Sequence, residues 1–286
     1  MIFKKFVFFS FFLLALAKTF AEPIRIATWN IRCIDQKDSL NGDTWLKRAP
    51  EISLLTHFHH FEIIGMQEVD SIQQMMLSNL LPEYKWISGE HHGNPIAYLP
   101  SRFEVVNQGT FWYSKDGQSN TKGWDARHPR FCNWAHFIEK NTKKEFFIFN
   151  SHWDHKGDTA RIESAKLALN KIPDIVKNKT FFFLGDFNSK PNRKALKLLE
   201  KGGLFDARTK AKYVYAPKPS FNHYKENNPE DNNLDYIYFL GNVNIIRFGI
   251  LDNTYRDEKR LRFPSDHFPL MIDFEFKNQI IDSITN

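Results

Sequence analysis

The 286-residue sequence contains only two cysteines, Cys33 and Cys132. They allow one disulfide bond at most, which could form in an oxidising compartment. The alternative is that both are small core side chains, and the sequence does not supply the Cα separation that distinguishes the two cases. The chain also lacks the set of thiolates that structural zinc sites use, so a structural zinc centre is not expected.

Long apolar runs are almost absent as well. The one clear run is Phe6–Ala17, which follows Lys4 and Lys5. It is well short of the roughly 20 residues that a helix needs to span a bilayer, and small residues that suit a signal peptidase come after it. We therefore expect residues 1–21 to be a cleaved signal peptide and residues 22–286 to be an exported domain, periplasmic or secreted. The alternative is an uncleaved membrane anchor.

A strong excess of one charge is also missing. The formal net charge of the whole chain is +6. The expected signal peptide carries Lys4, Lys5 and Lys18 and no acidic residue, so the mature chain keeps a net charge of only +3. A charge this small does not by itself indicate nucleic-acid binding. The substrate class must therefore come from the residues of the site.

Several common catalytic motifs do not occur in the sequence. It has no Gly-x-Ser-x-Gly nucleophile elbow, no Walker phosphate-binding loop and no His-Glu-x-x-His zinc helix. The paired carboxylates of a glycosidase cannot be identified from the sequence either. These absences leave other kinds of hydrolytic chemistry open.

The segments that are present predict a layered α/β domain. Short runs rich in Ile, Phe and Tyr predict strands at Ile24–Asn30, Glu62–Glu68, Phe146–Asn150, Thr180–Asp186, Leu234–Phe239 and Leu270–Phe276, with others at Ile96–Leu99, Val105–Trp112 and Cys132–Glu139. Amphipathic stretches between them predict helices at Trp45–His59, Ser71–Leu80, Thr159–Lys171 and Arg193–Glu200. No linker divides this pattern. Two polar segments, Lys115–Asp125 and Tyr213–Asn233, predict surface loops that could border a site.

Polar side chains stand at the ends of these predicted strands. They are Asn30, Glu68, His152, Asp186, Asn188, Asp235 and the pair Asp266-His267. Each one alone has an ordinary explanation, as a turn residue, a helix cap, an exposed carboxylate or a structural histidine. Their repeated position at apolar strand ends is harder to explain in that way, because catalytic sites of α/β folds gather there.

In this order the residues resemble the endonuclease/exonuclease/phosphatase superfamily, which includes deoxyribonuclease I, exonuclease III and the neutral sphingomyelinases. The resemblance extends from about Arg25 to Asp273. It is carried by the motifs Thr-Trp-Asn30, Gln-Glu68, Asn-Ser-His152, Gly-Asp186-Phe-Asn188, Leu-Asp235-Tyr and Ser-Asp266-His267. The run from Asn150 to Arg161 is most similar to the deadenylase and nocturnin branch, in which the position of Trp153 is usually Leu. The resemblance implies a four-layer α/β sandwich of two mixed sheets flanked by helices.

The resemblance also implies a metal site. Glu68, helped by Asn30, would hold Mg²⁺ or Mn²⁺, ions that prefer hard oxygen ligands and keep room for water and a substrate phosphate. Asp266 would be a further metal ligand or a support for its neighbour. The number of metal ions stays open.

The remaining residues of the set have implied catalytic roles. His267 would be the general base that activates water, and Asp235 would orient its ring and raise its basicity. Asp186 and Asn188 would position the nucleophile and a phosphoryl oxygen. His152 would donate a hydrogen bond to the phosphate and stabilise the transition state.

Two further residues are candidates for phosphate binding. Arg130 begins a segment similar to the strand that carries a phosphate-binding arginine in the deoxyribonuclease I group, and a guanidinium matches phosphate geometry. A solvated surface arginine is the alternative, and Arg127 is a competing candidate. His155 is either a phosphate contact or a structural residue.

The function expected from the sequence is an exported, metal-dependent phosphodiesterase, with a nuclease and a nucleic-acid substrate favoured. A phosphomonoesterase or a phospholipase, acting on inositol phosphates or sphingomyelin, would use the same residues. A binding module that has lost catalysis is the remaining alternative. The core motifs do not distinguish exonuclease from endonuclease action, and they leave the oligomeric state open.

Overall fold

The fold was derived from a computed structural model that describes residues 22–89, 91–118, 120–226, 232–257 and 260–277. The expected signal peptide, residues 1–21, lies outside the described residues. Among those described, no helix combines the length and apolar character that crossing a membrane requires.

Two mixed β-sheets form the centre of the molecule. The first has the strand order β10 (Tyr213–Tyr215), β12 (Val243–Ile250), β15 (Leu270–Phe276), β1 (Ile24–Asn30), β2 (Ile63–Gln67), β4 (Ile96–Tyr98) and β3 (Lys85–Ile87). The second has the order β5 (Phe103–Trp112), β6 (Phe131–Glu139), β7 (Glu145–His152), β8 (Phe181–Asp186), β11 (Asp235–Leu240) and β9 (Phe205–Asp206). A separate short pair joins β13 (Tyr255–Arg256) and β14 (Leu261–Arg262).

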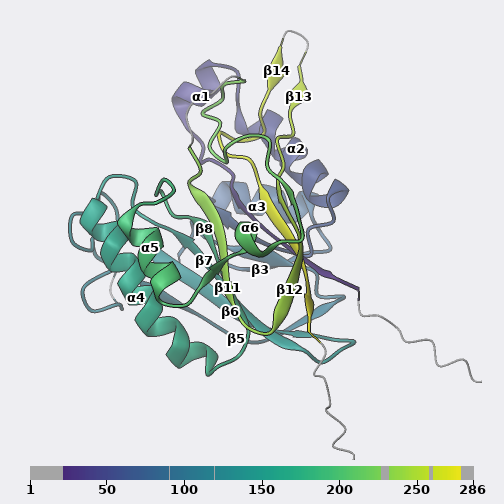
Figure 1. The fold of residues 1–286 in the computed structure, drawn as a ribbon. Coiled ribbons are helices and arrows are strands. Elements are labelled where there is room, and N and C mark those ends of the chain that lie inside the picture. Colours follow the sequence, from purple (N-terminus) through teal and green to yellow (C-terminus); the bar gives the residue numbers. More distant parts are fainter. Residues whose placement is uncertain (1–21, 90, 119, 227–231, 258–259, 278–286) are drawn as a thin grey trace, which may run out of the picture.

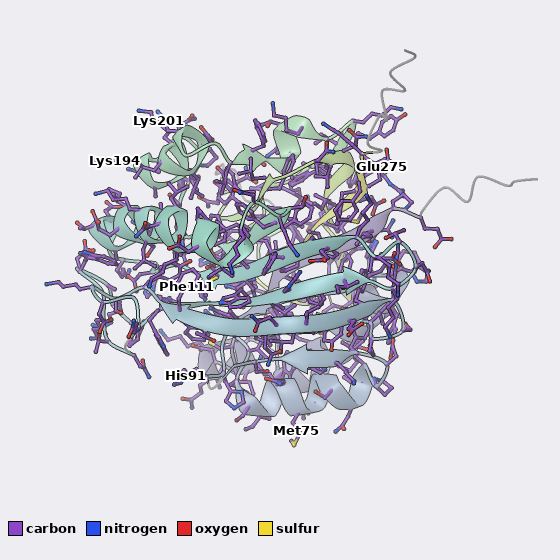
Figure 2. The ribbon with its side chains drawn as sticks, turned by 90° about the horizontal axis from the view of Figure 1, so that it is seen from below. Met75, His91, Phe111, Lys194, Lys201 and Glu275 are labelled. Carbon is purple, nitrogen blue, oxygen red and sulfur yellow. The ribbon has the colours of Figure 1, made fainter. Side chains whose placement is uncertain are left out.

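Helices cover the outer faces of the two sheets. The outer face of the first sheet carries α2 (Trp45–Phe58) and α3 (Ser71–Leu80), and that of the second carries α4 (Asp158–Val176) and α5 (Lys194–Lys201). The short helices α1 (Gln36–Leu40) and α6 (Ala207–Lys210) lie outside these two layers, and Ala207 of α6 packs in the cluster between the sheets. Figure 1 shows α4 and α5 side by side, and α1, α2 and the β13–β14 pair grouped at one end of the molecule. In Figure 2, Met75 of α3 lies on one outer face and Lys194 and Lys201 of α5 lie on the opposite one, with the strands between them. The expected four-layer sandwich is confirmed.

Three buried clusters fill the spaces between the layers. One lies between the sheets and includes Ile26, Ile148 and Phe182. A second joins the β5–β9 sheet to α4 and α5, and a third joins the β10–β3 sheet to α2 and α3. Because each sheet is covered on both faces, its central strands are apolar throughout instead of alternating. Strand β8 illustrates this, since Phe182 and Leu184 face the other sheet while Phe181 and Phe183 face the helices.

The predicted elements are present with small shifts of their ends. All nine strands expected from the sequence form, each within two residues of the expected bounds. Of the helices, α4 differs most, because it continues beyond Lys171 to Val176 and includes Pro173. Burial of Ile172 and Val176 in the cluster beneath α4 favours this extra length. Pro173 costs the helix the hydrogen bond that its missing N–H would donate to the carbonyl four residues earlier. The helix ends one turn after it, where Lys177 donates to the Pro173 carbonyl.

Six strands of the described residues were not predicted from the sequence, namely β3, β9, β10, β12, β13 and β14, and two of them show why. Strand β12 is eight residues long and mostly buried, but a β-bulge between Ile245 and Arg247 interrupts its alternation and hides the pattern. The expected loop Tyr213–Asn233 begins with the exposed strand β10, which pairs in parallel with β12. Lys115–Asp125 contains no helix or strand among its described residues, as expected.

Both cysteines are free thiols. Cys132 is fully buried in the cluster beneath α4, and its burial raises the pKa of the thiol to about 12. Cys33 is half-buried. The structure therefore shows no bridge between them and supports the core interpretation for Cys132.

Candidate active site

Strand ends from both sheets meet at one end of the sandwich. Strands β1 and β2 run in parallel, so Asn30 and Glu68 lie at neighbouring carboxyl ends. Strands β7 and β8 also run in parallel and place His152 opposite Asp186. Strand β11 runs the other way, so its first residue, Asp235, is the one that pairs with Asp186. The sequence-predicted residues are therefore brought together from separate segments by the sheet directions.

The carboxylate of Asp186 is the centre of this cluster. One oxygen accepts hydrogen bonds from the Asn30 amide at 3.0 Å and lies 3.4 Å from His152 Nε2 and 3.8 Å from His267 Nε2. The other oxygen accepts from the backbone N–H of Asn188 at 2.8 Å. Burial, together with the nearby Asp235 carboxylate, raises the pKa of Asp186 to about 7. Near neutral pH, the protonation state of Asp186 therefore depends on the neighbouring charged groups.

His267 forms a buried pair with Asp235. The distance from His267 Nδ1 to Asp235 Oδ2 is 2.8 Å, and both side chains are at most 5% exposed. Burial alone would lower the pKa of His267, but the Asp235 carboxylate outweighs it, and the pKa rises to about 10. The Trp29 indole N–H donates to the His267 carbonyl at 2.9 Å and holds the backbone in place. This is the geometry expected of a histidine whose orientation and charge are set by a carboxylate.

Loop residues complete the support of this pair. The ring of Phe221 packs on His267 with ring centroids 4.8 Å apart, and the two residues form an isolated β-bridge. The hydroxyl of Ser220 accepts from the backbone N–H of Asp235. The segment 213–233, expected to border the site, does so through these two residues.

Glu68 is the carboxylate best suited to a metal. It is half-buried and has a left-handed backbone, with φ at 62°. Its oxygens accept from the Asn30 amide at 3.1 Å and from the Cys33 backbone N–H at 3.0 Å. Burial would raise the pKa of Glu68, but His152 and these two hydrogen bonds outweigh it and lower the pKa to about 2. An ionised, partly accessible carboxylate with unused lone pairs fits a hard divalent cation.

Asn30 and Asp266 stand beside Glu68 in different ways. The Asn30 oxygen accepts from the Arg32 backbone N–H at 3.0 Å, while its nitrogen faces the two carboxylates. In this orientation the Asn30 amide nitrogen supports the Glu68 carboxylate, and the Asn30 oxygen is not turned toward a metal ion bound at Glu68. Asp266 is buried, and its burial raises the pKa of its carboxyl, with a further rise caused by Glu68. Arg32 lies 3.8 Å from it and offsets part of this negative charge.

A second group of side chains could also hold a metal. Donor atoms of Asp186, Asp235 and His267 all lie within 4.8 Å of one another, and all three residues are buried. The short contact between His267 Nδ1 and Asp235 already uses one donor atom of each, which favours a hydrogen-bonded pair over a ligand set. Glu68 is therefore the better position for the cation.

Arg130 and His155 form the rim next to His152. Arg130 lies with its Nη2 3.4 Å from His155 Nδ1 and its Nε 3.7 Å from Asp154. The Arg130 side chain is 17% exposed, and its Nε has no hydrogen bond to the protein. Burial, followed by the positive charge of Arg130, lowers the pKa of His152 well below its ordinary value. The ring of His152 and the cationic Arg130 together offer hydrogen-bond donors to an anionic phosphate.

Two supporting residues were missed from the sequence. Asp154 is buried and accepts from the backbone N–H groups of His128, Lys156 and Gly157, which fixes the rim loop. Arg48 is buried in α2 and donates to the carbonyls of Ile31 and Pro264, next to Asn30 and Asp266. Its signal was present, since positions 45, 48, 49 and 52 form the buried face of α2 and only 48 is charged.

The sequence and the structure were also compared with known proteins. A model of the Endonuclease/Exonuclease/phosphatase family matches residues 27–267. A mannosyl-6-phosphatase of Bacteroides thetaiotaomicron is 34% identical, with a TM-score of 0.86 over 88% of this chain and 100% of that one. The human nocturnin catalytic domain is 20% identical, with a TM-score of 0.67 over 90% and 94% of the two chains, which shows a common fold. An uncharacterised protein of Acanthamoeba polyphaga mimivirus is 27% identical over 51% of this chain, and the match spans only 59% of the viral protein.

Proposed function

The chain belongs to the Endonuclease/Exonuclease/phosphatase family, and from this premise we propose that it is a divalent-metal-dependent phosphomonoesterase that acts on a sugar phosphate. The observation that carries the proposal is the 34% identity to a mannosyl-6-phosphatase across the full length of that protein. The nuclease favoured by the sequence has weaker support, because the likeness to nocturnin is 20% and extends to the fold alone. We therefore place the phosphatase first.

The proposed reaction is the hydrolysis of a phosphate monoester by water. His267 Nε2 accepts the proton of the attacking water, and Asp235 holds the ring through Nδ1. Water adds to phosphorus, the bond from phosphorus to the sugar oxygen breaks, and that oxygen takes a proton from solvent water and leaves as the free hydroxyl. His267 then returns the proton it accepted to solvent. A divalent cation at Glu68 would offset the charge on the phosphoryl oxygens and would lower the pKa of His267 toward the range that a base requires.

The other residues bind and orient the phosphoryl group. Asp186 lies close to both His152 and His267, where it can orient the water. Asn188 would help to position one phosphoryl oxygen; its backbone N–H donates to Asp186, and its side-chain amide donates to the Trp153 carbonyl. His152 donates from its ring to a second oxygen, and Arg130 provides the fixed positive charge at the rim. These donors are placed before the reaction begins, so they stabilise the transition state without reorganisation.

A substrate panel tests the proposal. Residues 22–286 are incubated with Mg²⁺ or Mn²⁺ and with mannose 6-phosphate, a model phosphodiester, DNA, RNA and sphingomyelin vesicles, with and without chelator. We expect phosphate release from mannose 6-phosphate that the chelator stops and that His267→Ala lowers by at least about 10²-fold. His57→Ala is the matched control and should keep full activity, because His57 is an exposed histidine on α2 whose Nε2 lies 2.5 Å from Glu83.

The panel also decides between the phosphatase and the alternatives. Cleavage of DNA or RNA without release of phosphate from the sugar would contradict the phosphatase and establish the nuclease, which the similarity of Asn150–Arg161 to the deadenylase branch favours. Release of phosphocholine from the vesicles would point to a phospholipase.

We also propose that the enzyme is exported, on the evidence of the basic start and apolar run within residues 1–21. Expression of the full chain in a bacterial host, followed by N-terminal sequencing of the protein from the periplasm or medium, tests this. A mature start near Glu22 is the expected result. Retention of the complete N-terminus in the membrane fraction would instead establish an anchor.

A further inference from the structure

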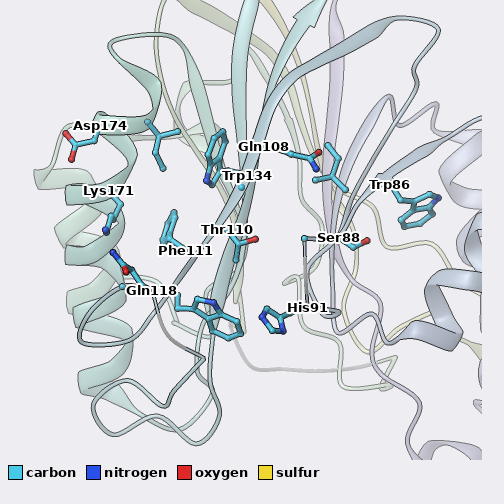
Figure 3. Close-up of a pocket in the computed structure, with 16 residues that line it drawn as sticks. Trp86, Ser88, His91, Gln108, Thr110, Phe111, Gln118, Trp134, Lys171 and Asp174 are labelled. Atoms are coloured by element: carbon cyan, nitrogen blue, oxygen red, sulfur yellow. The ribbon is translucent and has the colours of Figure 1, made fainter.

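A large groove lies along the free edge of strand β5, outside the residues assigned to catalysis. Its volume is 1070 Å³, and its lining includes Trp86, Gln108, Thr110, Trp112, Trp134 and Lys171. Figure 3 shows Lys171 and Asp174 on one wall, Trp86 and Ser88 on the other, and Gln108, Thr110 and Trp134 between them. We name it the β5 groove. This volume lies slightly above the usual range for small-molecule sites, which is about 300–1,000 Å³.

We propose that the β5 groove binds an oligosaccharide chain that carries the phosphate, so that the substrate is a phosphorylated glycan and not only a monosaccharide phosphate. The proposal rests on the proposed phosphatase function. It goes beyond that function because it assigns a second binding region, with its own ligand chemistry, to residues that do not contact the phosphate.

The groove begins close to the catalytic residues. Trp112 at the end of β5 pairs with Phe131 on the neighbouring strand β6. Cys132, the next residue on β6, pairs with Ser151 on β7, and Ser151 directly precedes His152. Two strand spacings of about 4.8 Å therefore separate Trp112 from His152, a distance of roughly 10 Å. From Trp112 back to Gln108 the groove follows β5 for four residues, roughly 13 Å more. This length suits two or three linked sugar rings beyond the phosphate.

A loop of the active site forms part of the same groove. Val69, which follows Glu68, forms an isolated antiparallel β-bridge with Gly93. The Val69 backbone N–H donates to the Gly93 carbonyl at 3.1 Å. Two residues away, His91 lines the groove and packs against Trp112, with ring centroids 4.6 Å apart. The segment that limits the groove is thus tied to the strand that presents Glu68.

Aromatic rings provide flat surfaces in the groove. Trp134 lies across its cross-strand partner Gly109, where an added Cβ would come within 2.8 Å of the indole ring. Trp86 and Trp134 are each half-buried, so each leaves part of its indole accessible. The apolar faces of sugar rings pack on such surfaces, which combine a broad apolar area with little conformational entropy to lose.

Polar groups next to these rings are neutral or balanced in charge. Gln108 and Gln118 are exposed amides, and Lys171 is offset by Asp174 on the same helix. Strand β5 is the outermost strand of its sheet, so its free edge adds backbone donors and acceptors. Amides and backbone groups match sugar hydroxyls. A nucleic acid would instead require a continuous row of cationic side chains, which the described lining residues do not form.

Binding without catalysis is the direct test. The His267→Ala variant of residues 22–286 is titrated calorimetrically with unphosphorylated mannotetraose, with cellotetraose as a second glycan and with an extended hydrophobic peptide. We expect mannotetraose to bind and Gln108→Ala, introduced into the same background, to weaken it about tenfold. Gln108 is exposed, so its replacement leaves the fold intact. Glu104→Ala, an exposed position on the same strand outside the groove, is the matched control.

A kinetic comparison links the groove to the reaction. In the active enzyme, we expect Gln108→Ala and Trp134→Ala to raise the KM for a 6-phosphorylated mannotetraose about tenfold more than the KM for mannose 6-phosphate. Glu104→Ala should leave the ratio of the two KM values unchanged.

The outcomes separate this inference from the proposed function. Hydrolysis of mannose 6-phosphate without tetraose binding, and with the same KM ratio in all variants, would overturn the groove assignment and keep the phosphatase. Tetraose binding without phosphatase activity would keep the groove and contradict the phosphatase. Binding of the peptide in place of both glycans would identify the free β5 edge as a site for strand addition and overturn the glycan proposal.

Discussion

The pairing of His267 with Asp235 shows how one contact can set the chemistry of a residue. A buried histidine ordinarily loses its proton, because burial disfavours the charged form. Asp235, 2.8 Å from Nδ1, outweighs that cost and raises the pKa of His267 to about 10. The same contact leaves Nε2 facing the side of the site where Asp186 lies.

Asp235→Asn should therefore change both the rate and its pH dependence. We expect kcat to fall by roughly 10²–10⁴-fold, the range for loss of an effective general base. Activity that requires a neutral His267 rises as pH increases through its pKa. Removing the carboxylate lowers that pKa, so the rising limb of the kcat/KM profile should move to lower pH.

The measurement is the pH profile of phosphate release with saturating metal, for the wild type and for Asp235→Asn. His136→Asn, which removes a histidine paired with Glu145 on a distant part of the second sheet, serves as the control for histidine replacement and should keep the wild-type profile. A rising limb that stays in place in Asp235→Asn, or moves to higher pH, would show that Asp235 does not set the pKa of the catalytic base.

Glu139 gives a residue-scale test of stability far from the site. Its carboxylate accepts from the Thr142 backbone N–H and hydroxyl, both at 2.6 Å. Burial would raise the pKa of Glu139, but these hydrogen bonds, helped by Arg102, outweigh it and lower the pKa below its ordinary value. The carboxylate therefore contributes stability above the ordinary glutamate pKa of about 4.3, and this contribution is lost as pH falls through the folded-state pKa.

We expect Glu139→Gln to lower the free energy of unfolding at pH 7. On acidification, the free energy of unfolding of the variant should then fall less than that of the wild type. The measurement is urea unfolding of both proteins at pH 7 and at a series of values below 4.5. Glu163→Gln, which changes a helix-surface pair with Lys166, should follow the wild type. Parallel pH dependences for the wild type and Glu139→Gln would rule out the proposed contribution.

At the scale of elements, the close approach of β7 and β8 depends on a glycine. Gly185 has φ at 139°, and an added Cβ would lie 1.9 Å from the Ser151 carbonyl oxygen on the neighbouring strand. The strands cannot separate there without moving His152 away from Asp186, their next registered pair. A residue with no side chain is thus required one position before the central carboxylate.

Gly185→Ala should therefore destabilise the protein by several kcal/mol and abolish activity, since both a backbone clash and a disfavoured φ are introduced. Gly203→Ala is a matched control, because its φ is 91° and nothing lies within 4 Å of an added Cβ. It should lose only about 1 kcal/mol from backbone strain and stay active. Equal decreases in the free energy of urea unfolding for the two variants would show that the contact between the added Cβ and the Ser151 carbonyl oxygen is relieved at no cost.

Much of the element pattern could be predicted because the sheets are buried on both faces. Runs such as Phe181–Leu184 have few conformations that bury every side chain, so their strands are clear from sequence. The pattern failed where geometry departs from regularity, as at the bulge in β12. It also failed where tertiary burial overrides a local signal, as when α4 continues through Pro173.

The candidate site was recoverable for a related reason. Candidate site residues such as Asn30, Glu68 and Asp186 stand at the ends of apolar strands, so both their position and their residue type are visible in the sequence. Their contacts could not be predicted, because the 3.0 Å hydrogen bond from Asn30 to Asp186 joins residues of different sheets. The β5 groove could not be predicted either, since α4, β3 and β5 contribute to it from distant segments.

At the scale of the whole molecule, the site is a junction between two sheets. Asn30 and Glu68 belong to the end of one sheet, while His152, Asp186 and Asp235 belong to the other. The carboxylates of Glu68, Asp186 and Asp266 are thereby held close together, and the positive charges of His267 and Arg32 compensate part of their negative charge. A cation bound there stabilises the folded state specifically, because the unfolded chain does not bring these carboxylates together.

Metal should therefore raise the melting temperature, and Glu68 should be required for most of the increase. A ligand present at 100 times its dissociation constant adds about 2.7 kcal/mol of stability, which corresponds to a shift of roughly 5–10 °C in a domain of this size. We expect that shift for the wild type with Mg²⁺ or Mn²⁺ in excess over chelator, and a much smaller one for Glu68→Gln.

Glu163→Gln, at the surface of α4, should respond as the wild type does. Because Glu68→Gln also removes a half-buried charge, its melting temperature without metal must be measured, and only the increase caused by metal tests the site. An increment as large in Glu68→Gln as in the wild type would place the cation elsewhere, with the buried group of Asp186, Asp235 and His267 as the next position to examine.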